Sequence, residues 1–329
     1  MTQQRTRATA IDAVRVLGIF AVVVGHVWST TFVNELVYPW HVPVFFFLTG
    51  YLWKAGRSLK LEVRSRTRSL LVPYAAWLVI IGVAFFVTLA ATSETFGLTA
   101  VGKTIYGGSF ATRPFSAFWF VTALFFAAVF LRALERLGTW AQWSVAVLGL
   151  AVCAVAGDKV AELPLAIGVA VPCMTFILAG VEFRRLRARI TNPLLVGLLM
   201  LAFGFSLVFT HVSTPLDLKY GYFGVPVLGV CVAVVISAGF LLVAESVLRT
   251  VTAAPATAIV RLAQAGLVVV LTHAVVLWIL KTPATGSVVA LVLCLVCSWT
   301  LGLVVIHSRL SPLLAGQPRV NAPKVSQLE

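Results

Sequence analysis

Charged side chains are scarce in this sequence. Only 11% of its 329 residues are Asp, Glu, Lys or Arg, whereas 60% are hydrophobic and the mean hydropathy is +1.01. An average soluble domain has about 25% charged residues. This composition excludes an ordinary soluble domain. Apolar runs of about 20 residues recur along the chain, and they predict a polytopic membrane protein.

Cysteine is also rare. The five cysteines all lie within apolar segments, where small thiols pack as hydrophobic groups, so no disulfide framework is indicated. Cys294 and Cys297 form a CxxC pair, but no His or second Cys pair stands at ligand spacing, and we therefore expect no metal site. The chain also lacks the internal repeat that is typical of many transporters.

The hydrophobic pattern predicts an all-α fold, a membrane bundle of about ten transmembrane helices. The first apolar run contains an acid and a base and lacks a small-residue cleavage site, so we expect a retained helix and no signal peptide. We expect one integral membrane domain over residues 1–310 and a polar, disordered cytoplasmic tail over residues 311–329. The predicted spans are 11–31, 37–53, 69–91, 116–133, 140–157, 163–183, 193–211, 223–244, 258–280 and 286–306.

The distribution of Lys and Arg predicts the orientation. With the N-terminus in the cytoplasm, 19 of the 25 basic residues fall in cytoplasmic segments, as the positive-inside rule requires, and five fall in outer loops. Both termini are then cytoplasmic. Membrane topology thus accounts for the formal charge of +14, and we expect membrane lipids, but no nucleic acid, as partners.

The first predicted span contains three residues that a lipid-facing helix avoids, Asp12, Arg15 and His26. At about 100° per residue all three lie on one side of the helix, and at about 1.5 Å per residue His26 lies roughly 16 Å beyond Arg15, near mid-membrane. Asp12 and Arg15 stand at i, i+3 and can pair. The pattern favours a polar track into the membrane, although interfacial anchoring and a structural histidine remain the alternative.

Five stretches, in this order, resemble the acyltransferase-3 family of integral membrane acyltransferases, most closely its branch that O-acetylates sugars. They are "IDAVRVLGIFAVVVGHV" with Arg15 and His26, "HVPVFFFLTGYLWK" from His41, "VRSRTRSLLVPY" from Val63, "FWFVTALFF" from Phe118 and "VLTHAVV" around His273. The first four match in spacing over about 130 residues, while the second half matches only in its helix pattern and His273.

The resemblance implies that an acyl group, most often acetyl, passes from cytoplasmic acyl-CoA to a hydroxyl of an envelope carbohydrate or glycolipid. It implies no permanently bound cofactor, because acetyl-CoA or another acyl-CoA is a co-substrate. Family members use the residues equivalent to His26 and Arg15 as a functional pair. We assign the catalytic site to His26, Arg15 and Asp12, with His26 as the general base that takes the hydroxyl proton and Arg15 closer to the donor.

The remaining site assignments concern the two substrates. Six basic residues lie within Lys54–Arg68, more than the two or three that topology accounts for, and we expect Arg64, Arg66 and Arg68 to bind the donor phosphates. His41, Tyr51 and Trp119 are candidate acceptor-binding residues, with aromatic packing or a structural role as the alternative.

A proton-coupled secondary transporter that uses the Asp12, Arg15 and His26 face is the alternative function, and a structural membrane subunit is a third class. The Ala- and Val-rich helices are typical of a bacterial protein, and we expect the plasma membrane as its location. The acceptor, the acyl chain length and the oligomeric state are not encoded in any motif of the sequence.

The orientation is testable by cysteine labelling. In a Lys60→Cys variant the new thiol should react with an impermeant maleimide only after the cells are opened, because the predicted 54–68 segment faces the cytoplasm. The parent protein serves as the control for its native cysteines. Labelling of position 60 in intact cells would contradict the orientation.

Overall fold

The computed structural model describes residues 3–92 and 98–320. Helices and turns make up these residues, no strand occurs among them, and the all-α helix-bundle prediction is confirmed. The helices are α1 (Gln3–Val27), α2 (Thr31–Val37), α3 (Pro43–Tyr51), α4 (Leu59–Arg66), α5 (Val72–Ala91), α6 (Leu98–Tyr106), α7 (Phe118–Leu134), α8 (Thr139–Ala161), α9 (Ile167–Leu186), α10 (Pro193–Phe209), α11 (Leu228–Val247), α12 (Ala253–Ile279), α13 (Val288–His307) and α14 (Ser311–Leu314).

Eight helical segments of the described residues are long and apolar enough to cross a membrane. One of them is the continuous stretch Leu59–Ala91, in which α4 and α5 are joined by a π-helical turn over Thr67–Leu71. The helix α10 has 17 residues and is a shorter apolar helix. Nine of the ten predicted spans therefore correspond to single helical segments, and the chain is a multi-pass membrane protein.

The predicted span 37–53 is not one helix. Residues 38–42 form turns between α2 and α3, and α3 alone has nine residues, too few to cross the roughly 30 Å hydrocarbon core. Pro43, which lacks a backbone N–H, begins the new helix. The segment nevertheless runs the length of α1: Gly25 faces Tyr38, Gly18 faces Phe45, and Arg7 donates a hydrogen bond to the Tyr51 hydroxyl.

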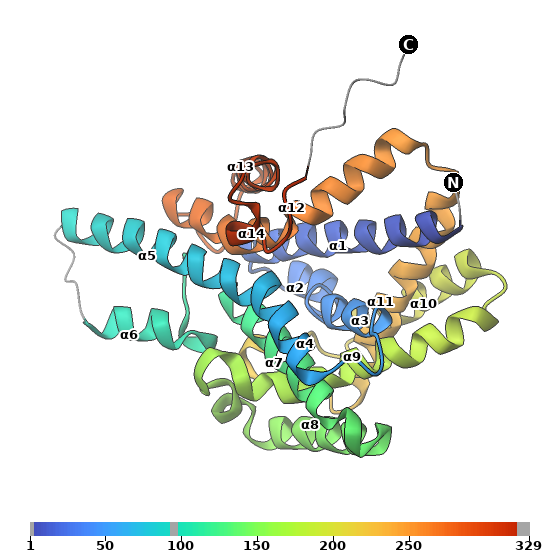
Figure 1. Ribbon diagram of the computed structural model, residues 1–329. Coiled ribbons are helices and arrows are strands. Elements are labelled where there is room, and N and C mark those ends of the chain that lie inside the picture. Colours follow the sequence, from blue (N-terminus) through green and yellow to red (C-terminus); the bar gives the residue numbers. More distant parts are fainter. Residues whose placement is uncertain (1–2, 93–97, 321–329) are drawn as a thin grey trace, which may run out of the picture.

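The helix α1 lies at the centre of one side of the bundle. It packs against α12 and α11, and it contacts α2 and α3 (Figure 1). The helix α3 packs against α9, and α7 packs against α9 as well, so α9 lies between them as a largely buried helix. This arrangement brings the end of α1, the α2–α3 turn and the start of α7 to the same end of the bundle.

Buried ion pairs connect the helices at the opposite end, where α1 begins. The Glu245 carboxylate on α11 accepts hydrogen bonds from the Tyr51 hydroxyl at 2.9 Å and from Arg187 Nε at 2.6 Å, and it pairs with Arg7. Glu245 is only 5% exposed. A single buried carboxylate thus links α1, α3 and α11 to the segment after α9.

A second buried carboxylate, Glu62, organises the neighbouring part of this end. It pairs with Arg66 at 2.5 Å, Arg57 at 3.5 Å and Arg132 at 3.4 Å. The Arg132 guanidinium also lies over the Trp53 ring, 4.1 Å from its centroid. Most of the predicted basic loop is helical, since α4 begins at Leu59. Ser58 caps this helix by accepting a hydrogen bond from the backbone N–H of Leu61.

The predicted tail boundary at residue 311 does not match the structure. Residues 311–314 form α14, Ser311 and Leu314 are buried, and the Trp77 indole N–H donates to the Leu314 carbonyl at 2.9 Å. The packed chain continues to Val320, whose backbone N–H donates to the Ile306 carbonyl. The rest of the predicted tail, residues 321–329, lies outside the described residues.

The crossing of α3 and α9 depends on two glycines. A Cβ added at Gly180 would overlap the Phe47 carbonyl, and one added at Gly50 would overlap the Ile177 carbonyl. We expect Gly180→Ala to destabilise the protein by about 1–3 kcal/mol, since overpacking forces the helices apart. The measurement is the thermal midpoint in detergent.

Gly82→Ala is the matched control, because Gly82 is also helical and a Cβ there would meet nothing within 4 Å. It should leave the midpoint unchanged or raise it slightly, since alanine favours helix over glycine. Equal midpoints for Gly180→Ala and Gly82→Ala would contradict this prediction and show that α3 and α9 can move apart without loss of stability.

Candidate active site

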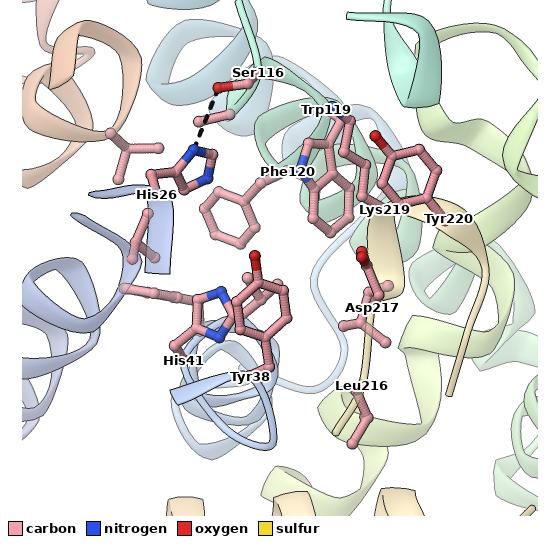
Figure 2. A pocket seen from close by; sticks show the side chains of 16 residues that line it. His26, Tyr38, His41, Ser116, Trp119, Phe120, Leu216, Asp217, Lys219 and Tyr220 are labelled. Atoms are coloured by element: carbon pink, nitrogen blue, oxygen red, sulfur yellow. Dashed lines mark hydrogen bonds between the residues drawn. The ribbon is translucent and has the colours of Figure 1, made fainter. Parts of the chain in front are cut away.

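A pocket of about 180 Å³ lies at the end of the bundle where α1 terminates. Its wall comes from five parts of the chain (Figure 2). The end of α1 contributes His26, the α2–α3 turn contributes Tyr38 and His41, the segment that leads into α7 and its first turn contribute Ser116 and Trp119, the loop between α10 and α11 contributes Leu216 to Tyr220, and α12 contributes Val270.

His26 lies in the last turn of α1, one residue before the helix ends. The helix α1 begins at Gln3 and ends at Val27, earlier at both ends than the predicted span, so His26 lies at the end of its helix and not midway along it. The His26 Nδ1 atom lies 3.3 Å from the Ser116 hydroxyl oxygen. Figure 2 shows the other ring nitrogen, Nε2, turned toward the open part of the pocket. An imidazole nitrogen is thus available to a bound molecule.

Arg113 fixes the backbone that holds His26. Its Nη2 donates to the His26 carbonyl at 2.7 Å, and its Nη1 donates to the Thr282 carbonyl at 2.6 Å. The carbonyls in the last turn of a helix have no partner within the helix, and a cation there also complements the helix dipole. Arg113 therefore ties the end of α1 to the chain segment that follows α12.

His273 on α12 lies directly beside His26. The two ring centroids are 4.9 Å apart and the rings are nearly perpendicular, at 84°. The His273 Nδ1 atom bonds to the Val269 carbonyl at 3.0 Å, and its Nε2 is buried without a hydrogen-bond partner among the described residues. In the neutral ring Nδ1 carries the proton that is donated to the carbonyl, so Nε2 is a bare acceptor beside the His26 ring.

His41 closes the opposite wall. It is 6% exposed, its Nδ1 donates to the Val37 carbonyl at 2.8 Å, and the Tyr38 ring lies 4.8 Å from its own ring. Its tautomer is fixed in the same way as that of His273. Two of the predicted acceptor-binding residues, His41 and Trp119, therefore line the same pocket as His26.

The loop between α10 and α11 adds two charges to the pocket, Asp217 and Lys219. Burial lowers the pKa of Lys219 to about 8, although the nearby Asp217 carboxylate opposes this shift. Burial also raises the pKa of Asp217, and the nearby Lys219 ammonium opposes that rise. The Lys219 ammonium donates to the Ala111 carbonyl at 2.6 Å, so it holds the loop against the segment before α7.

Tyr51, the third predicted acceptor residue, does not line this pocket. Its hydroxyl lies between Arg7 and Glu245 at the other end of α1. The structure separates Tyr51 from His41 because Tyr51 stands ten residues further along the chain, and α3 carries it away from the turn. Its role is to link the buried ion pairs.

Asp12 and Arg15 form the predicted pair, with Arg15 Nη1 2.9 Å from Asp12 Oδ1. Neither residue lines the pocket. On the same side of α1, between Arg15 and His26, the buried side chains are Ile19 and Val22. The predicted polar track is therefore interrupted by apolar packing, and the structure places His26 in a different environment from Arg15.

The three predicted donor-binding arginines lie on the α4–α5 segment, at the end of the bundle opposite the pocket. Arg64 and Arg68 are exposed, whereas Arg66 is half-buried and bonded to Glu62. Arg132, on the same cluster, stands thirteen residues after Trp119 on α7, so the cluster and the pocket are about 20 Å apart along that helix.

Sequence reasoning missed Ser116, Arg113, Asp217 and Lys219. The two basic residues were counted only as outer-loop charges. A usable signal did exist, because basic residues in outer loops run against the positive-inside rule and call for another explanation. His273 was interpreted as packing or pore lining, and only the helix arrangement shows that it contacts His26.

A family model described as an acyltransferase domain matches residues 9–309, nearly the whole described chain. No curated protein and no solved structure matches this chain.

Proposed function

Because residues 9–309 place this chain in the acyltransferase-3 family, which makes it a membrane acyltransferase, we propose that it is an acyl-CoA-dependent O-acyltransferase. The group transferred is acetyl, and the acceptor is a hydroxyl of an envelope carbohydrate or glycolipid in a bacterial plasma membrane. The matched region includes His26 and all the residues that line its pocket.

One observation supports this chemistry most directly: the Nε2 face of His26 is turned into a partly enclosed pocket (Figure 2). A hydroxyl that attacks a thioester must lose its proton, and a neutral imidazole is well suited to accept it. Ser116, Arg113 and His273 hold the ring and its backbone in place. A base that is oriented in this way needs no rearrangement before it accepts the proton.

The pocket also suits a carbohydrate. Tyr38, Trp119 and Tyr220 offer aromatic surfaces for a sugar ring, and Asp217 offers a hydrogen-bond acceptor. Our topology places this pocket near the outer face, where an envelope acceptor arrives. His41 and Trp119 therefore remain acceptor-binding residues in this proposal.

The donor arrives at the other end. Arg66 lies beside Arg57 and Arg132 around Glu62, and Arg64 and Arg68 flank Arg66 along the chain. Among the described residues only two carboxylates, Glu62 and Glu135, pair with this group. The excess positive charge suits the phosphates of coenzyme A. Its thioester stands at the end of a long arm, which suits the separation of about 20 Å along α7. Arg15 lies on α1 between the two ends.

The transporter alternative has less support. A proton relay along α1 requires polar groups between Arg15 and His26, and the side chains there are the buried Ile19 and Val22. Gly18, on the intervening turn, packs against Phe45. The family assignment also favours an enzyme.

The first prediction concerns His26. We expect His26→Gln to lower turnover by about 10²–10⁴-fold while the protein stays folded, since glutamine keeps a hydrogen-bonding side chain but cannot accept a proton near neutral pH. The measurement is acetyl transfer by the purified enzyme, together with the thermal midpoint.

His307→Gln is the matched control, because His307 likewise lies in the last turn of a long helix, where its ring bonds to the Leu303 carbonyl, but it is at the end of α13, outside the pocket. It should keep full activity. A well-expressed His26→Gln protein with near-normal transfer would remove His26 from the chemistry.

The second prediction concerns the donor. Replacing Arg64, Arg66 and Arg68 by Gln should raise the KM for acyl-CoA at least tenfold and leave the KM for the acceptor unchanged, since each charge-assisted contact contributes about 1.5–3 kcal/mol. Because Arg66 also pairs with Glu62, the Arg64→Gln/Arg68→Gln double variant separates donor binding from loss of that ion pair.

Neutralising Arg189 and Arg249, which are exposed and belong to the same predicted cytoplasmic side, is the control and should not change the donor KM. If the donor KM is unchanged in both the triple and the double variant, these arginines set the membrane orientation and do not bind the donor.

A further inference from the structure

Trp119 differs from the other buried tryptophans in its ring nitrogen. Trp40, Trp53 and Trp77 each donate the indole N–H to a protein oxygen, at 2.8, 3.5 and 2.9 Å. Trp119 is equally buried as a residue, at 6% exposure, but its N–H makes no hydrogen bond within the described residues, and the nitrogen atom itself is accessible from the pocket. A buried tryptophan ordinarily finds a partner for its N–H, so this donor is available to a molecule that enters the pocket.

The orientation of the ring supplies that explanation. In Figure 2 the pyrrole edge of Trp119 points across the pocket toward His26, whose Nε2 points back from the opposite wall. A base and an unengaged hydrogen-bond donor therefore face the same space. The Phe120 side chain lies between the two walls on one side and contacts Trp119, with 6.5 Å between ring centroids.

The other polar groups at this end have different roles. Both Nη atoms of Arg113 are bonded to backbone carbonyls, and the Lys219 ammonium uses one of its three N–H groups to hold its loop against the Ala111 carbonyl. The Ser116 hydroxyl oxygen accepts from His26 Nδ1 in the tautomer that leaves His26 Nε2 free to take a proton. The Tyr38 hydroxyl also faces the pocket, but a phenol both donates and accepts, which suits a sugar hydroxyl. An indole N–H only donates, which suits an oxygen that becomes negative.

We propose that Trp119 is a catalytic residue whose Nε1–H donates a hydrogen bond to the thioester carbonyl oxygen as acyl transfer converts it to an oxyanion. This inference rests on the proposed function, and it assigns Trp119 a role beyond stacking on the acceptor. A donor aimed at developing charge in a site shielded from water stabilises the transition state more than the ground state.

The step balances with the groups on either wall. The acceptor hydroxyl oxygen forms a bond to the carbonyl carbon, and the π electron pair of the carbonyl moves to its oxygen, which Trp119 stabilises. The hydroxyl proton passes to His26 Nε2. When the tetrahedral intermediate collapses, the C–S bond breaks, and the departing coenzyme A thiolate takes the proton from His26. Trp119 keeps its own proton throughout.

The test removes the N–H and keeps the ring. Trp119→Phe removes the donor but is smaller, so the sharper variant carries 3-benzothienylalanine at position 119, in which sulfur replaces the N–H with nearly the same shape. The readouts are kcat and the KM values for acetyl-CoA and for the acceptor, measured on the full-length protein in detergent or nanodiscs.

We expect both variants to lower kcat by about 10²-fold with little change in either KM, as removal of one oxyanion donor does in other enzymes. Trp77→Phe is the matched control, because Trp77 is as buried but its N–H already bonds to the Leu314 carbonyl, away from the pocket. It should keep its kcat.

Two results would overturn the inference: an unchanged kcat in the benzothienylalanine variant, or a rise in the acceptor KM alone, which would make the indole a ground-state contact. These results are distinct from failure of the proposed function. If the function is wrong, the unmodified protein itself transfers no acetyl group from acetyl-CoA.

Discussion

The alignment of α1 with the segment from Val37 to Tyr51 is the constraint on which the site depends. Three contacts fix it along its length: Arg7 with Tyr51 at one end, Gly18 with Phe45 in the middle and Gly25 with Tyr38 at the other end. This alignment sets His41 and His26 into one pocket. A shift of α3 by one turn, about 5.4 Å, would break the link to Glu245 and separate the two imidazoles.

The two ends of the bundle treat polar groups differently. Where α1 begins, Glu62 and Glu245 are almost fully buried, and each pairs with more than one arginine. Removing one partner from such an arrangement leaves a buried charge, so this end is built for stability. Where α1 ends, His273 has a buried ring nitrogen without a partner among the described residues, and Trp119 lines the pocket. Unused hydrogen-bonding capacity in the wall of a concave site is what a bound substrate satisfies.

Much of the architecture was predictable because each membrane-spanning helix requires a long apolar run in the sequence. Nine of ten spans and the i, i+3 pair of Asp12 and Arg15 follow from composition and helical spacing. The broken span 37–53 was not predictable from hydropathy, since the turn residues around His41 and Trp40 are as apolar as the helices beside them. The folded stretch 311–320 was missed because its few apolar side chains, Leu314 among them, find partners only in tertiary packing.

The sequence by itself determined a multi-pass all-α protein, the acyltransferase-3 resemblance and His26 as the candidate base, because these depend on residue type and on spacing along one helix. Tertiary structure decided which residues surround that base. Ser116, Arg113 and His273 come from segments 90, 87 and 247 positions away along the chain, and no local pattern links them to His26. The helix arrangement also places the Tyr51 hydroxyl beside Glu245, away from the pocket, and directs the Trp119 ring nitrogen toward the pocket. Helix packing brings residues together across the bundle, and spacing within one segment cannot report contacts between segments.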